Sequence, residues 1–209
     1  MQKTKKLIYV VFIVLLILGQ VTLAFSKCNR VLKNGWMNNW EPYVFGTPDK
    51  PSGLDTEILD AIVTGAGCKL VFTQNEFPWA RHLAMVRNGK LDFANAAQKT
   101  KEREEYAYFI GPYRAEYYGI FIRKGEASKF SLTKAEDLTK INFKIGAIIG
   151  YNYGEKLNSI FEKMKYSVQR VPEKKGDINL MNRHKLLANR IDGYLASTVD
   201  EILLLKKSK

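Results

Sequence analysis

The sequence predicts an α/β protein with two lobes, each an open and mostly parallel sheet with flanking helices. One observation is that short apolar runs alternate along the chain with segments of helical periodicity, as in βαβ units. Another is the change of character near residues 117–128, where an apolar run passes into Arg123-Lys124-Gly125-Glu126 and the chain crosses between lobes. A length of 209 residues is enough for one large core or two modest ones. We expect a first lobe over residues 27–117 and a second lobe over residues 118–209.

The apolar runs are expected to form the strands, and the segments between them the helices. Strands are predicted at residues 30–36, 69–73, 91–96, 117–123, 143–149, 166–171 and 191–195. Apolar side chains recur at helical spacing in three stripes: Leu54, Ile58 and Ile62; Trp79, Leu83 and Val86; and Tyr153, Leu157, Ile160, Phe161 and Met164. Residues 199–205 are also expected to be helical. We interpret the stripes as the faces that pack on the core.

The N-terminal residues have the order of a secretory signal. Lys3, Lys5 and Lys6 precede an apolar stretch at 7–18, and Ala24-Phe25-Ser26 then supplies small residues at the two positions that a signal peptidase reads. The apolar stretch is shorter than the about 20 residues that span a bilayer. The sequence therefore predicts a signal peptide over residues 1–26 that is cleaved and directs the protein to the periplasm. An uncleaved membrane anchor is the alternative.

Charge and composition limit the partners. Lys and Arg outnumber Asp and Glu by 33 to 21, which gives a formal net charge of +12. No Lys/Arg-rich block follows the first residues, and there is no RNA-binding signature, so we expect no nucleic-acid partner. His82 and His184 have no Cys or carboxylate at ligand spacing, so no metal is expected.

An exported chain with two cysteines is expected to form one disulfide. Cys28 precedes the first predicted strand and Cys68 precedes the second. If these strands are parallel neighbours, the two cysteines meet at the N-terminal ends of the strands. Two buried thiols are the alternative.

Aromatic and hydrogen-bonding residues gather after the predicted strands. In open α/β sheets, ligands bind outside the carboxyl ends of the strands. The residues at these ends are Asn38, Asn39, Trp40, Glu41, Pro42 and Tyr43; Pro78 and Trp79; Asn95, Gln98, Thr100 and Arg103; Gly150 through Glu155; and Ala196, Ser197 and Thr198. The pattern predicts a cleft with one wall from each lobe.

Two of these positions are suited to an anion. Asn152 and Glu155 have the spacing of a helix start, where unpaired amides and the helix dipole favour negative charge. Arg103 could bind the same anion from the other wall. Alternatively, Asn152 only caps its helix and Arg103 pairs with Glu102 or Glu105 on the surface. Asp55, Glu57 and Asp92 are assigned structural roles, since the first two suit the first turn of a helix.

The chain resembles the periplasmic solute-binding proteins of amino-acid ABC importers, solute-binding family 3, over about residues 30–205. The motifs in the first lobe are Gly53-Leu54-Asp55-Thr56-Glu57-Ile58-Leu59-Asp60-Ala61-Ile62, the segment from Trp79 to Gly89-Lys90-Leu91-Asp92, and Thr100-Lys101-Glu102-Arg103 with Phe109, Pro112 and Tyr113. In the second lobe they are Ile145-Gly146, Gly150-Tyr151-Asn152-Tyr153-Gly154 and Asn189-Arg190-Ile191-Asp192-Gly193.

The resemblance implies a two-lobed clamshell of the periplasmic-binding-protein type II, which closes on a small solute. Its implied ligand contacts are Trp40, Trp79, Asn95, Ala96, Gln98, Arg103, Tyr151, Asn152 and Ser197, with Arg103 on the carboxylate of the ligand. Ser197 stands where amino-acid binders commonly carry an acid for the α-ammonium group. The family's chain also continues past the matching point and returns to the first lobe, so the resemblance implies a C-terminally truncated chain without that return segment.

The function implied is that of a binding protein without catalysis. It would capture a small carboxylate-bearing solute, an amino acid or a related compound, and deliver it to the membrane permease of an ABC importer. We expect a monomer without cofactors. One alternative is an exported cyclic-acid dehydratase on the same fold, which needs a general acid, and Glu41 is the only acid noted after a predicted strand. Another is a sensor module anchored to the membrane by residues 7–25.

Overall fold

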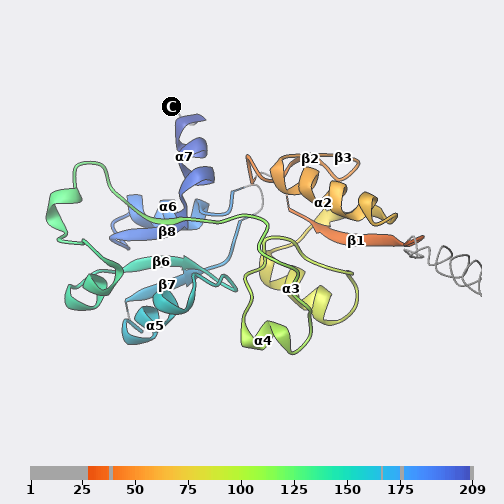
Figure 1. Cartoon of the computed structure of the whole chain (residues 1–209). Coiled ribbons are helices and arrows are strands. Elements are labelled where there is room, and N and C mark those ends of the chain that lie inside the picture. Colours follow the sequence, from red (N-terminus) through yellow and green to blue (C-terminus); the bar gives the residue numbers. More distant parts are fainter. Residues whose placement is uncertain (1–27, 38–39, 166, 175–176, 208–209) are drawn as a thin grey trace, which may run out of the picture.

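The two predicted lobes are present in the computed structural model, which describes residues 28–37, 40–165, 167–174 and 177–207. The predicted signal peptide lies outside the described residues. Figure 1 shows the lobes side by side, with an extended segment ahead of β5 passing from one to the other. Among the described residues, no helix has the length and apolar character needed to cross a membrane.

The first lobe is built on two parallel strands, β1 (Val31–Trp36) and β4 (Lys69–Glu76). A short antiparallel hairpin that was not predicted, β2 (Phe45–Thr47) and β3 (Lys50–Ser52), follows β1. The helices of this lobe are α2 (Leu54–Gly65), α3 (Trp79–Arg87) and the single turn α4 (Lys101–Glu104). The strands and helices thus alternate as predicted, and α4 brings Arg103 to the end of the lobe.

A disulfide joins Cys28 to Cys68, as predicted. Each cysteine lies just before one of the two parallel strands, and the register pairs Val31 with Lys69. This register places the two Cα atoms 4.8 Å apart. The bridge therefore closes the N-terminal end of the first sheet, the end away from the ligand side predicted for such sheets.

The strand predicted at 91–96 is reduced to one bridge, between Asn34 and Phe93. The chain turns at Ala96, whose φ is +54°, a left-handed conformation that ends an extended strand. Beyond this bridge, Asn95 is connected to the first strand through side chains, since its side-chain oxygen accepts a hydrogen bond from the Asn34 side-chain amide at 2.9 Å. The prediction was right about the direction of this segment and wrong about its length as a strand.

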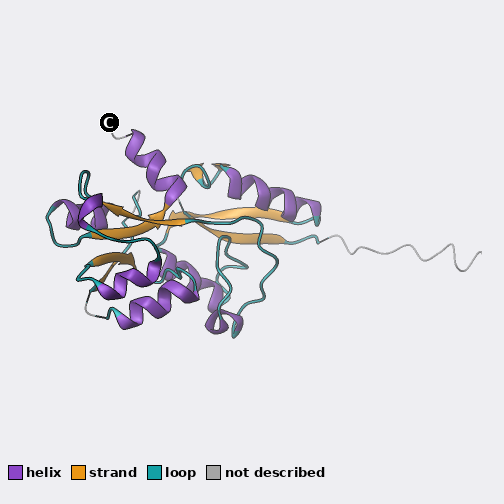
Figure 2. Ribbon diagram, turned by 60° about the vertical axis from the view of Figure 1, so that its left-hand side comes forward, coloured by secondary structure: helices purple, strands orange, loops and turns teal. Residues whose placement is uncertain are grey.

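The second lobe contains a four-stranded sheet in the order β5-β8-β6-β7. Its strands are β5 (Tyr118–Ile122), β6 (Ile145–Ile148), β7 (Val168–Val171) and β8 (Gly193–Ser197). β6 is parallel to both β7 and β8, whereas β5 is antiparallel to β8. The helices are the 3-10 turns η1 (Ala127–Lys129) and η2 (Ala135–Lys140), followed by α5 (Glu155–Lys163), α6 (Leu180–Leu187) and α7 (Thr198–Lys207). Figure 2 shows helices above and below the strands.

Both faces of this sheet are covered, which explains its continuous apolar strands. On one face Ile145, Ala147 and Leu195 pack with the α5 side chains Ile160 and Phe161. On the other face, a second cluster contains Leu186, Ile191, Tyr194 and Ala196. Because side chains alternate along a strand, neighbouring residues of β8 serve different clusters. The predicted stripe of α5 is thus confirmed as a core face.

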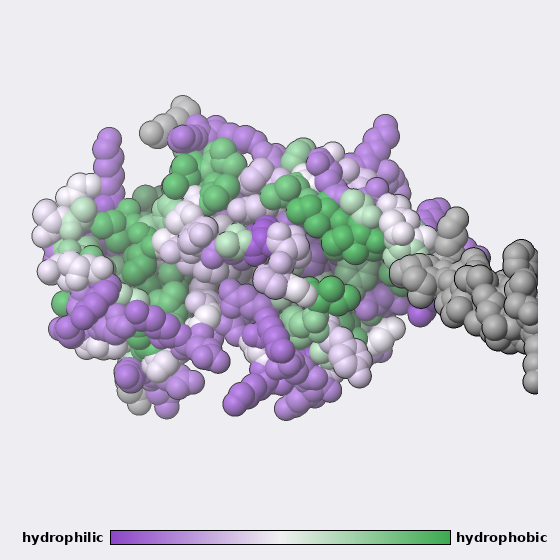
Figure 3. Space-filling view, in the orientation of Figure 1, coloured by the Kyte–Doolittle hydropathy of each residue, from purple (hydrophilic) through white to green (hydrophobic). Residues whose placement is uncertain are grey.

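The predicted core face of α2 was wrong. Leu54 and Ile62 are 46% and 57% exposed, whereas the helix buries Asp55, Thr56, Leu59 and Val63. On the buried side of the helix, the Arg114 Nε atom lies 2.8 Å from the fully buried Asp55 carboxylate, so the charge of Asp55 is compensated inside the lobe. In Figure 3, hydrophobic surface accordingly covers the part of the first lobe where α2 lies.

Candidate ligand-binding site

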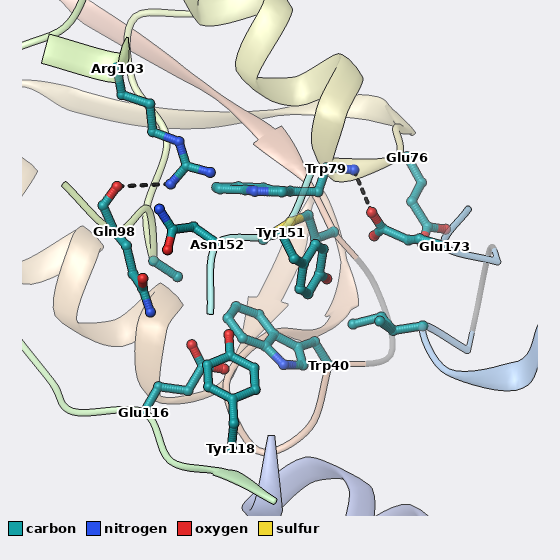
Figure 4. A pocket seen from close by; sticks show the side chains of 13 residues that line it. Trp40, Glu76, Trp79, Gln98, Arg103, Glu116, Tyr118, Tyr151, Asn152 and Glu173 are labelled. Atoms are coloured by element: carbon teal, nitrogen blue, oxygen red, sulfur yellow. Dashed lines mark hydrogen bonds between the residues drawn. The ribbon is translucent and has the colours of Figure 1, made fainter. Parts of the chain in front are cut away.

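A cavity lies between the two lobes, at the carboxyl ends of the parallel strands. Its volume is about 570 Å³, with the space at its open mouth included. Figure 4 shows side chains from both lobes pointing into it. The lining residues are Met37, Trp40, Glu76, Trp79, Ala96, Gln98, Arg103, Glu116, Tyr118, Tyr151, Asn152, Glu173 and Ile178.

Arg103 lines this cavity and connects the two lobes. The side chain of Thr100 caps α4 by accepting a hydrogen bond from the Arg103 amide at 3.2 Å, which fixes the start of this short helix. The guanidinium donates to the Gln98 carbonyl at 2.8 Å and, across the cavity, to the Gly150 carbonyl at 3.3 Å. The residue is only 7% exposed.

The positive charge of Arg103 is not balanced by a carboxylate. No ion pair involves Arg103 within the described ranges, and burial lowers the pKa of its guanidinium. A buried cation whose hydrogen bonds go only to carbonyl oxygens is costly, and a carboxylate in the cavity would offset that cost. The arrangement can therefore bind an anionic group.

The loop after β6 approaches the first lobe through Gly150. A Cβ atom at Gly150 would lie 3.0 Å from the Cβ of Ala80 in α3, and the φ of Gly150 is +81°. Both the conformation and the close approach favour glycine here. The Arg103–Gly150 hydrogen bond lies at the same contact between the lobes, so this is a state in which the lobes touch.

Aromatic rings form the walls of the cavity. Trp79 begins α3 directly after Pro78, and its ring lies 5.9 Å from the guanidinium carbon of Arg103. Trp40 is held against Tyr43, with ring centroids 5.1 Å apart, and the Arg114 guanidinium lies 5.0 Å from the Trp40 ring. Tyr151, from the second lobe, is so enclosed that burial raises its pKa well above the ordinary value. These rings can pack an apolar chain or contact a cation.

The helix that follows Asn152 begins later than predicted. α5 starts at Glu155, with Gly154 rather than Asn152 at the cap position. The Asn152 side-chain oxygen accepts hydrogen bonds from the Gly154 amide at 2.7 Å and from the Asn158 side chain at 3.0 Å. Asn152 therefore shapes its own loop while it lines the cavity.

Most of the residues expected to contact ligand meet at this one cavity, but Asn95 and Ser197 do not line it. Asn95 is buried, and its side-chain amide donates a hydrogen bond to the Asp55 carboxylate at 3.4 Å. It therefore belongs to the hydrogen-bond network inside the first lobe. Ser197 lies at the end of β8 and lines a smaller cavity that shares Trp40 and Glu116 with the main one. Glu41, the acid noted at a strand end, pairs instead with Lys207.

Three carboxylates that the sequence reasoning missed line the main cavity: Glu76, Glu116 and Glu173. Glu76 is the last residue of β4, and Glu173 lies two positions after β7, so the rule about strand ends also selects them. Glu116 comes before β5. It reaches the cavity because β5 is antiparallel, and its start lies beside the end of β8, where Tyr118 pairs with Ser197.

Burial raises the pKa of both Glu116 and Glu173 above the ordinary carboxyl value. The Glu173 carboxylate accepts a hydrogen bond from the Trp79 amide at 2.5 Å, which opposes this rise. The negative charge of Glu76 adds to the rise at Glu173, as expected of two nearby acids. The cavity therefore contains groups of both charges, one cationic and three acidic.

Comparison with known proteins agrees with this geometry. Residues 32–201 match the family described as bacterial extracellular solute-binding proteins, family 3. A relative is the probable amino-acid-binding protein YxeM of Bacillus subtilis (strain 168), 24% identical over 191 residues, which cover 91% of this chain and 68% of YxeM.

Solved structures share the fold at low sequence identity. An ancestral arginine-binding protein bound to arginine has a TM-score of 0.65 and 21% identity, with 85% of this chain and 74% of that chain covered. A histidine kinase sensor domain with similarity to periplasmic binding proteins has a TM-score of 0.67 and 19% identity, with 86% and 73% covered. These similarities confirm the predicted two-lobed fold.

Proposed function

Because the chain belongs to the bacterial extracellular solute-binding proteins, family 3, we propose that it captures an amino acid or a related carboxylate-bearing solute. The solute binds between the lobes, without chemical conversion, and is delivered to the permease of an ABC importer. The name of the relative YxeM, a probable amino-acid-binding protein, supports the class of solute. The periplasmic location and the signal peptide at residues 1–26 are part of the same proposal.

The observation that carries this proposal is the position of Arg103. Its guanidinium is buried at the contact between the lobes, faces the cavity and lacks a carboxylate partner in the described part of the chain. A charge-assisted hydrogen bond to a ligand contributes about 1.5–3 kcal/mol. Binding in the micromolar range needs about 8 kcal/mol, so this group supplies a useful fraction and the ring contacts of Trp40 and Trp79 add to it.

Capture would work by closure of the lobes on the solute. Residues from both lobes line the cavity, so the full set of contacts exists only when the lobes approach each other. A solute that makes more contacts in the closed state shifts the population toward that state. The Arg103–Gly150 hydrogen bond connects the ligand-binding group to this movement.

The proposal is tested by a thermal-shift screen of the twenty common amino acids and simple carboxylates, with the wild-type protein and Arg103→Ala. A solute that binds raises the midpoint of unfolding, and Arg103→Ala should lose that rise. Arg81→Ala is the matched control, since Arg81 is an exposed arginine of α3 that does not line the cavity.

A stabilising solute whose effect is equal in Arg103→Ala and Arg81→Ala would show that Arg103 is not the anchor. Chemical conversion of the bound solute, followed by mass spectrometry of the solute, would instead favour the dehydratase alternative. N-terminal sequencing of the exported protein checks the cleavage: a first residue near position 27 supports the signal peptide, and an intact N-terminus supports the membrane anchor.

A further inference from the structure

The charges around the cavity are unusual for so basic a chain. The formal net charge is +12, yet the cavity is lined by three glutamates and one arginine. A solute that carried only a carboxylate would add a further negative charge to this lining. The charge of the lining therefore favours a solute that carries positive charge as well as a carboxylate.

The three glutamates are half-buried, and they differ from the fully buried Asp55 and Glu201, which have cationic partners. Asp55 is fully buried and pairs with Arg114 at 2.8 Å, and Glu201 is 2% exposed and pairs with Arg183 at 2.5 Å. Across the residues that the structure describes, no ion pair involves Glu76, Glu116 or Glu173. Glu76 and Glu173 leave their charge available to a group inside the cavity, whereas at Glu116 the charge of Arg114 and a hydrogen bond with Tyr118 oppose the rise in pKa that burial causes.

Glu76 and Glu173 lie together at one end of the cavity. They come from different lobes, Glu76 from the end of β4 and Glu173 from the segment after β7. Figure 4 shows the two side chains beyond one end of the Trp79 ring and the Arg103 guanidinium beyond the other. The Trp79 amide, which bonds to Glu173, fixes that carboxylate beside the ring. A solute along Trp79 would thus meet opposite charges at its two ends.

Glu116 marks a second acidic position, where the cavity joins the smaller one beside β8. Ser197 and Asp200 also line this smaller cavity. Ser197 is 6% exposed, and its hydroxyl lies beside the Asp200 carboxylate, where it opposes the rise in the pKa of Asp200 that burial causes. The negative charge of Asp200 adds to the effect of burial in raising the pKa of Glu116, as expected of two nearby acids, so this position is suited to a cationic group.

We propose, on the basis of the function proposed above, that the solute is a basic amino acid with three charged groups. Arg103 takes its carboxylate, and Glu116 takes its α-ammonium with the help of Ser197 and Asp200. Glu76 and Glu173 take the cationic end of its side chain, and the rings of Trp40 and Trp79 enclose the chain between. A neutral side chain would leave the half-buried Glu76 and Glu173 carboxylates next to each other without a cation, which is unfavourable.

The test is isothermal titration calorimetry of the full chain with two pairs of solutes of similar shape. L-Arginine is compared with L-citrulline, and L-lysine with L-norleucine, so that each pair differs chiefly in the side-chain charge. We expect the basic member of at least one pair to bind about tenfold to a hundredfold more tightly. The pair that shows the preference identifies whether the site takes a guanidinium or an ammonium group.

Glu76→Gln and Glu173→Gln should each reduce that preference to less than about threefold while the affinity for the neutral member stays the same. Glu57→Gln is the matched control, because Glu57 is an exposed glutamate of α2 outside the cavity, and it should keep the full preference. Circular dichroism checks that each variant is folded.

The outcomes separate this inference from the function on which it rests. If neutral amino acids bind at least as tightly as basic ones, and this binding needs Arg103, the proposed function stands and the basic substrate class is wrong. If the preference for basic amino acids persists in Glu76→Gln and Glu173→Gln, these residues do not form the cation site. If only carboxylates without a cationic group bind, the proposed function stands and this inference is wrong; if neither amino acids nor simple carboxylates bind the folded wild-type protein, both proposals fail.

Discussion

Substitution of Gly150 by alanine tests whether the contact between the lobes belongs to the ligand-bound state. Gly150 has a φ of +81°, and an added Cβ would lie 3.0 Å from the Cβ of Ala80 on the other lobe. The substitution therefore introduces two separate costs. The first is local strain of the backbone, and the second is steric conflict that arises only when the lobes meet.

The two costs affect different measurements. A non-glycine residue in the left-handed region costs about 1–2 kcal/mol, which lowers the free energy of unfolding. Overpacking of a contact costs about 1–3 kcal/mol. If binding requires the lobes to meet, the second cost appears in the affinity, as an about 5-fold to 150-fold increase in Kd.

Gly125→Ala is the matched control for this experiment. Gly125 has a φ of +83°, and an added Cβ would meet nothing within 4 Å. Both variants should therefore lose similar stability in urea unfolding, whereas calorimetric titration with the solute should show weaker binding in Gly150→Ala alone. Equal affinities of the two variants would refute the conclusion that the solute is bound while these lobes touch.

Two further predictions concern stability. Removal of the disulfide in the Cys28→Ala/Cys68→Ala double variant opens a loop with a sequence separation of 40 and should lower the free energy of unfolding by about 4 kcal/mol in urea titration; an unchanged urea midpoint would contradict it. Burial lowers the pKa of His82 to about 4. Between about pH 6.5 and pH 4 the unfolded chain therefore binds a proton that the folded chain does not. As the pH decreases through this range, the free energy of unfolding should decrease by on the order of 3 kcal/mol. Urea unfolding from pH 7 to pH 4 should show this loss in wild type and in the control His184→Gln but not in His82→Gln, and equal pH slopes in the two variants would contradict the assignment.

The order of elements could be predicted from the sequence because each carries its own periodicity. The alternation of apolar runs and helical stripes identified the two lobes, and the parallel pairing of β1 with β4 followed from it, together with the disulfide. The apolar runs and helical stripes are local patterns, and β1 and β4 are neighbouring elements of one βαβ unit. Tertiary contacts did not need to be known.

The face that a helix buries depended on a contact that was distant in sequence. The stripe of Leu54, Ile58 and Ile62 is apolar, but α2 turns the side with Asp55 inward, where Arg114 from the crossing segment meets it. The periodicity of the sequence does not indicate that the Asp55 carboxylate is buried with Arg114, a partner 59 residues away. His82 is a similar case: it is fully buried, with its Nε2 atom 3.1 Å from the Asn34 side-chain oxygen.

The acidic half of the candidate site could be predicted only in part. The rule about the carboxyl ends of strands reaches Glu76 and Glu173 once the ends of β4 and β7 are known. Glu116 lies before its strand and enters the cavity only because β5 runs antiparallel at the edge of the sheet. The direction of an edge strand is set by its neighbour in the fold, so the sequence before that strand did not indicate a ligand-binding position.

A crystal structure of the full chain with L-arginine bound would test the central claim most directly. The account predicts the carboxylate of the solute within hydrogen-bonding distance of the Arg103 guanidinium, in the cavity bounded by Trp40, Trp79 and Tyr151. A structure in which the bound solute lies elsewhere, or in which its carboxylate is held by other groups while Arg103 contacts only protein carbonyls, would contradict it.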